Sequence, residues 1–124
     1  MKKVVILGAS IEPDRYSNMA MHNLLKHNHK IILVSPKYDE IDGHPCLHQL
    51  SEVKEKVDAL TMYVGAKISS TMINEIVKLA PKIVIFNPGT ENPSLYQALH
   101  QAGIKHLEAC TLVLLNTNQF DGIF

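Results

Sequence analysis

The amino-acid sequence predicts an α/β fold built on a parallel sheet, and three observations indicate it. Apolar runs such as residues 4–7 and 31–34 show no polar alternation, which is typical of strands covered on both faces. Segments with apolar residues at helical spacing alternate with these runs. Glycine and proline turns separate the two kinds of segment. We therefore expect a Rossmann-like, doubly wound parallel sheet of five strands with helices on both faces.

The expected elements alternate regularly along the chain. Strands are predicted at residues 4–7, 31–34, 59–64, 83–86 and 104–107. Helices are predicted from Ser17 to Asn28, at 51–56, from Ser69 or Ser70 to Ala80, from Asn92 to Gln101, and at 111–116. Their signals are polar caps, helical spacing and stops such as Gly103. Because crossovers are right-handed, few topologies remain, and we expect the order 3-2-1-4-5, with strands numbered along the chain.

The composition fits one globular domain over residues 1–124. Hydrophobic residues make up 46% of the chain and charged residues 19%, which is not the composition of a disordered chain. Lysine and arginine together number 12, as do aspartate and glutamate, so no global basic field exists to hold nucleic acid or a membrane surface. Any phosphate-bearing ligand must therefore be held by local features.

The remaining bulk features indicate the compartment and the absence of metal. Cys46 and Cys110 lie far apart in sequence and are expected to be free thiols. The apolar run near Met1 is too short for a secretion signal, and no apolar stretch approaches the ~18 residues of a membrane span. We expect a soluble, cytoplasmic protein. The segment His44-Pro45-Cys46-Leu47-His48 holds metal-ligand residue types, but nothing completes a tetrahedral set, and no metal site is predicted.

The turn after the first expected strand, Gly8-Ala9-Ser10, is a candidate phosphate site. Ligands of doubly wound sheets bind at the carboxyl ends of the strands. This turn leads to a helix start, where unpaired backbone N–H groups and the helix dipole favour an anion. Gly8 and Ala9 leave the backbone accessible. Ser10 and Ser17 offer hydroxyls, and Arg15 offers a forked cation suited to phosphate.

The same edge lacks several known signatures. Only Gly8 of a G-x-G-x-x-G fingerprint is present, no Gly-Lys-Ser/Thr of a P-loop occurs, and Glu12 stands where a nucleophile elbow needs glycine. No paired carboxylates or Ser-His-Asp order stands out, so no catalytic residue is predicted. The second strand ends in Ser35-Pro36-Lys37, with a cation where an NAD site has a carboxylate. Lys37 favours a phosphorylated ribose, as in coenzyme A or NADP.

Four short motifs resemble those of a known family. They are Gly8-Ala9-Ser10, Pro13 with Arg15, Val34-Ser35-Pro36-Lys37 and Glu108-Ala109-Cys110. In their order and spacing the chain resembles the small single-domain CoA-binding proteins of bacteria, related to the CoA-binding domain of the succinyl-CoA synthetase alpha subunit. One departure is Thr111, which stands where many relatives have a proline after the cysteine.

The resemblance implies that coenzyme A lies across the carboxyl edge. It implies that the Gly8–Ser10 turn and Arg15 contact phosphates, and that Ser35, Pro36 and Lys37 border the 3′-phosphate end. It further implies that two groups of residues complete the site. Tyr63 and Val64 flank the adenine, and Asn87, Pro88 and Gly89 line the pantetheine path.

Two main hypotheses follow for function. The first is a non-catalytic module that binds coenzyme A or an acyl-CoA, with no nucleic-acid or membrane partner. The second is an NADP-binding enzyme or redox sensor on the same fold, since fold alone does not decide between them. Lys37 fits both hypotheses, and the missing glycines disfavour the second. A third reading is an interaction subunit with a vestigial pocket.

Overall fold

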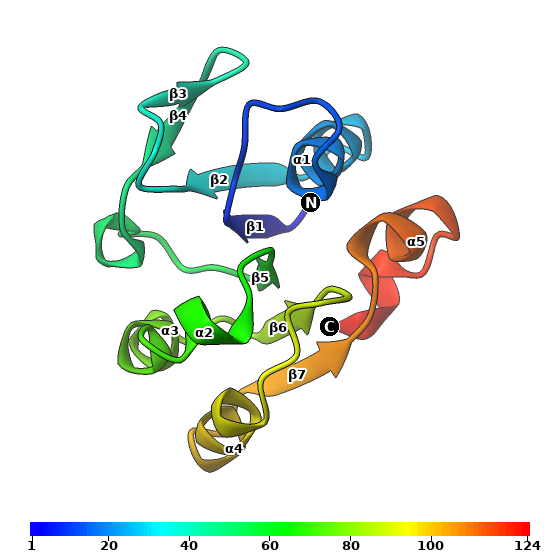
Figure 1. Cartoon of the computed structure of the whole chain (residues 1–124). Coiled ribbons are helices and arrows are strands. Elements are labelled where there is room, and N and C mark those ends of the chain that lie inside the picture. The colour runs from blue at the N-terminus through cyan, green and yellow to red at the C-terminus, as the bar shows by residue number, and fades with distance from the viewer.

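A computed structural model describes residues 1–124 as one sheet covered by helices on both faces (Figure 1). The seven strands are β1 (Lys3–Leu7), β2 (Lys30–Val34), β3 (Glu40–Ile41), β4 (His44–Leu47), β5 (Ala59–Met62), β6 (Ile83–Phe86) and β7 (Lys105–Glu108). The helices are α1 (Tyr16–Lys26), α2 (Ala66–Ser69), α3 (Ile73–Leu79), α4 (Pro93–Gln101) and α5 (Thr111–Asn116). Two short 3₁₀ turns are Leu50–Glu52 and Phe120–Ile123.

Two apolar cores lie on opposite faces of the sheet. Alternate residues of one strand belong to different cores: Val4 and Ile6 pack with α1 and α5, whereas Val5 and Leu7 pack with α3 and α4. Strands β1, β5 and β6 are therefore almost wholly buried, which explains why their sequences are apolar except for Lys3 and Thr61. The predicted α/β class with helices on both faces is confirmed.

The predicted five-stranded sheet and its order are wrong. The structure has a seven-stranded mixed sheet in the order β3-β4-β2-β1-β5-β6-β7. Strand β4 pairs in parallel with β2, with Leu33 opposite Cys46, and β3 pairs antiparallel with β4. The outer edge of β2 is thus occupied, and β5, which was expected there, pairs instead with β1, where Val5 lies opposite Leu60.

The physical reason for this error is the weak strand signal of β4. Its sequence, HPCL, contains a proline and buries only Cys46 fully. Neither its composition nor an apolar alternation distinguishes it from a loop, so the pairing with β2 decides its conformation. The sequence pattern predicts no strand between residues 37 and 50, so the prediction misses both β3 and β4.

The helix boundaries show smaller corrections. Helix α1 begins at Tyr16, with Arg15 at the N-cap position, and not after a Ser17 cap. The expected helix at 51–56 is only the turn Leu50–Glu52, and the helix expected from Ser69 or Ser70 divides into α2 and α3. Helix α4 is confirmed: Asn92 accepts the Leu95 N–H and Pro93 occupies the first turn. None of these helices is long and apolar enough to cross a membrane.

Candidate nucleotide-binding site

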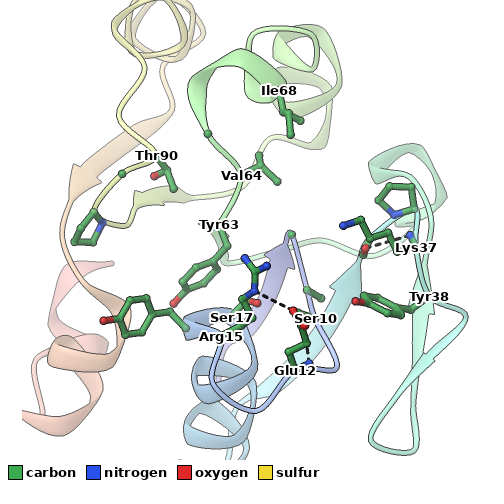
Figure 2. A pocket seen from close by; sticks show the side chains of 18 residues that line it. Ser10, Glu12, Arg15, Ser17, Lys37, Tyr38, Tyr63, Val64, Ile68 and Thr90 are labelled. Atoms are coloured by element: carbon green, nitrogen blue, oxygen red, sulfur yellow. Dashed lines mark hydrogen bonds and ion pairs between the residues drawn. The ribbon is translucent and has the colours of Figure 1, made fainter.

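A pocket of about 520 Å³ opens at the carboxyl edge of the sheet (Figure 2). It extends from the turn after β2, through the turns after β1 and β5, to the turn after β6. Tyr16 and Ser17 of α1 and Ile68 of α2 complete its wall. The pocket thus lies where ligands of doubly wound sheets bind, beside the point at which the chain changes direction across the sheet.

The pocket brings together twelve of the thirteen predicted site residues. These are Gly8, Ala9, Ser10, Arg15, Ser17, Ser35, Pro36, Lys37, Tyr63, Val64, Pro88 and Gly89. The thirteenth, Asn87, is outside the lining because its side chain is directed into the protein, where it is 3% exposed. Its Nδ2 donates to Thr61 Oγ1 at 2.7 Å and to the Met62 carbonyl at 2.8 Å. Asn87 therefore supports the turn after β6 from inside the protein, and Pro88 and Gly89 of that turn line the pocket.

Gly8 is the tightest point of the site. Its φ of +94° is accessible to glycine with little strain, and a Cβ at this position would lie 3.0 Å from the backbone carbon and oxygen of Tyr63. The Gly8 and Ala9 N–H groups both donate to the Val34 carbonyl, at 3.0 and 3.2 Å. These two donors are therefore used inside the protein and are not available to a ligand.

Other backbone donors around this turn are free. The N–H groups of Ser10, Tyr16 and Ser17 donate to no acceptor in the protein. Tyr16 and Ser17 form the first turn of the eleven-residue helix α1, so the helix dipole points its positive end at the pocket. The free N–H groups therefore lie at Ser10 and the helix start, where the sequence predicts unpaired donors, and not at Gly8 and Ala9.

The turn after β2 owes its shape to Ser35. The Ser35 N–H donates to the Leu47 carbonyl of β4 at 2.8 Å, and its buried Oγ accepts the Lys37 N–H at 3.2 Å. The Lys37 side chain is exposed at one end of the pocket (Figure 2). The strand that sequence reasoning missed, β4, therefore helps to position the predicted cation.

Three tyrosines and three charged side chains determine the character of the lining. The tyrosines are Tyr16, Tyr38 and Tyr63; burial raises the pKa of Tyr63 to about 12, so its phenol is neutral at physiological pH. The charged groups are Glu12, Arg15 and Lys37. Arg15 Nε donates to Glu12 Oε2 at 3.0 Å. The lining therefore offers flat apolar surfaces and a small excess of positive charge.

Six lining residues were not among the predicted site residues. They are Glu12, Tyr16, Tyr38, Gly65, Ile68 and Thr90. Each lies within four residues after a predicted site residue, so extending every predicted turn by four residues would have found them. Cys110 is outside the lining and precedes α5.

A mainly parallel sheet with helices on both faces and a pocket at its carboxyl edge defines the class of Rossmann-like domains. Residues 2–116 match the model of the CoA binding domain. The chain therefore belongs to this CoA-binding domain family, which confirms the family predicted from the four motifs.

Several known proteins are similar to the chain. It is 34% identical over 74 residues to the ADP-forming acetate–CoA ligase I of Archaeoglobus fulgidus, which covers 60% of this chain and 11% of the ligase. It is 31% identical over 97 residues to an ADP-forming acetate–CoA ligase of Methanocaldococcus jannaschii, which covers 77% of this chain and 14% of that enzyme. The chain thus matches only a small part of both ligases. A crystal structure of an uncharacterized protein aligns with a TM-score of 0.91 and 40% identity, over 96% of this chain and 98% of that one.

Proposed function

We propose that this protein binds coenzyme A or an acyl-CoA in the pocket at the carboxyl edge and performs no chemistry on it. The observation that carries the proposal is that the pocket of this CoA-binding family member is lined by twelve residues predicted for that ligand. The proposal also rests on the chemistry of the lining, in which free N–H groups, two cations and tyrosine rings match phosphates and an adenine.

The positions of these N–H groups, cations and rings determine how the ligand is oriented in the pocket. Lys37 stands at the β2 end of the pocket and receives the 3′-phosphate. The diphosphate lies at the start of α1, against Arg15 and the N–H groups of Ser10, Tyr16 and Ser17. The pantetheine arm then runs toward Pro88 and Gly89 at the β6 end, and the adenine packs against Tyr63 and Val64.

The lining supports binding without catalysis. Its one carboxylate, Glu12, is paired with Arg15, and burial keeps Tyr63 protonated. The thiol of Cys110 and the carboxylate of Glu108 belong to residues outside the lining. No group in the pocket is therefore arranged as a nucleophile with an adjacent base.

NADP is the second candidate ligand, because Lys37 would also accept a 2′-phosphate. Calorimetric titration of the protein with CoA, acetyl-CoA, NADP and NAD separates the candidates. We expect saturable binding of CoA and acetyl-CoA and none of NAD. Binding of NADP without CoA would overturn the proposed function and support the redox alternative.

A further inference from the structure

Arg15 is the only arginine of the chain, and a carboxylate of its own loop holds its guanidinium. The distance between Arg15 Nε and Glu12 Oε2 is 3.0 Å, and both side chains line the pocket. Figure 2 shows the pair in the middle of the pocket, between Lys37 on one side and Tyr63 on the other. The cation best suited to a phosphate therefore already has its Nε–H donor bonded to a carboxylate.

The backbone of the loop holds the two side chains together. The Arg15 N–H donates to the Glu12 carbonyl at 3.0 Å and closes a tight turn over Pro13 and Asp14. The Glu12 N–H donates in turn to Ser10 Oγ at 3.1 Å, which ties this turn to the Gly8-Ala9-Ser10 segment. The pair is thus a property of the loop itself and forms without any ligand.

A carboxylate and a phosphate offer a guanidinium the same kind of acceptor oxygen. A diphosphate at the start of α1 that engaged the Nε–H of Arg15 would have to displace Glu12 Oε2, and it would be repelled by the charge of Glu12. We propose that Glu12 is an internal competitor that lowers the affinity of the pocket for phosphate-bearing ligands by holding Arg15. This inference rests on the proposed function and adds a regulatory element to the same site.

The exposure of the pair determines how strong this competition is. The side chains of Arg15 and Glu12 are 68% and 54% exposed, and exposed ion pairs contribute little free energy. Glu12 therefore tunes the affinity and does not block the pocket. The competition acts only on ligands that engage Arg15, so it affects CoA and dephospho-CoA equally.

Calorimetric titration of Glu12→Gln with CoA tests the inference, since glutamine keeps the size of the side chain and removes its charge. We expect binding about two- to fivefold tighter than in the unmodified protein. Asp14→Asn is the matched control, because Asp14 is an exposed carboxylate of the same turn outside the pocket lining. It should change the affinity less than about twofold. An unchanged affinity in Glu12→Gln, or an equal gain in the control, would overturn the inference.

A double-mutant cycle with Arg15→Ala separates competition from simple charge repulsion. If Glu12 acts by holding Arg15, adding Glu12→Gln to Arg15→Ala should give no further gain. If Glu12→Gln raises the CoA affinity of the Arg15→Ala variant as much as that of the unmodified protein, the proposed competition for Arg15 is wrong. If no variant binds CoA at all, the proposed function itself fails, and that result differs from CoA binding with equal affinity in every variant.

Discussion

The Asn87 side chain connects the end of β6 to the start of α5: its Oδ1 accepts the Thr111 N–H at 2.8 Å. Its Nδ2 donates to Thr61 Oγ1 and to the Met62 carbonyl, and the hydroxyls of Thr61 and Thr111 are 2.8 Å apart. Asn87 and both threonines are at most 3% exposed. A fully bonded polar cluster therefore lies beneath the pocket and joins the ends of β5 and β6 to the start of α5.

Removing the Asn87 amide should destabilise the protein strongly. Asn87→Ala leaves the Thr111 N–H and the Met62 carbonyl without their partner in a buried position. Each lost partner costs about 1–3 kcal/mol, so we expect the free energy of unfolding to fall by about 2–4 kcal/mol. Urea denaturation measures this. Asn74→Ala is the control, because Asn74 is exposed and should matter by less than about 0.5 kcal/mol. An equally small effect of Asn87→Ala would show that the Asn87 hydrogen bonds do not stabilise the fold.

Gly8→Ala should distort the site. The new Cβ would lie 3.0 Å from backbone atoms of Tyr63, in a residue with a φ of +94°. We expect a loss of stability of about 2 kcal/mol or more and weakened CoA binding, because the β1 and β5 turns must separate. Gly122→Ala tests whether the position matters, since a Cβ there meets nothing within 4 Å. Thermal unfolding and titration of both variants check this, and equal Tm values would contradict it.

The parts of the fold that could be predicted are those fixed by local sequence. Strands β1, β2, β5 and β6 are mainly apolar runs, and α4 carries its own cap at Asn92. Strand β4 could not be predicted, because its pairing with β2 and not its composition holds it extended. The error in strand order follows from that one omission.

The candidate site likewise has features that the sequence predicts and features that it does not. Its turns could be predicted because every parallel strand ends at the same edge. The directions of side chains could not: Asn87 is directed inward to Thr61 and Thr111, while Glu12 is directed at Arg15. Those directions depend on partners from distant strands or on the shape of a turn, which the sequence pattern alone does not show.

Lys37→Ala should distinguish the two phosphate groups of the proposed ligand. The ammonium lies at the β2 end of the pocket, apart from the start of α1, so it should meet the 3′-phosphate and not the diphosphate. We expect about tenfold weaker binding of CoA and less than a twofold change for dephospho-CoA, measured by calorimetry. Equal losses for both ligands would remove Lys37 from the 3′-phosphate site.

His29 should make the stability of the protein depend on pH. Its Nδ1 accepts the Lys2 N–H at 3.0 Å, its side chain is 5% exposed, and its ring packs against Phe120 with centroids 5.0 Å apart. Burial lowers the pKa of His29 below the ordinary value of 6.5, although Asp121 acts in the opposite direction. Protonation of Nδ1 would also break the bond to Lys2.

Because the folded-state pKa of His29 lies below the unfolded-state value, the unfolded chain binds the proton first as the pH falls. The contribution of His29 to the free energy of unfolding is therefore complete above pH 6.5 and is lost between pH 6.5 and the folded-state pKa. We expect His29→Asn, whose Oδ1 can still accept the Lys2 N–H, to show a smaller loss of stability between about pH 7 and pH 5. Urea denaturation across this range measures the difference. Identical pH profiles for the two proteins would show that the acid sensitivity comes from other groups.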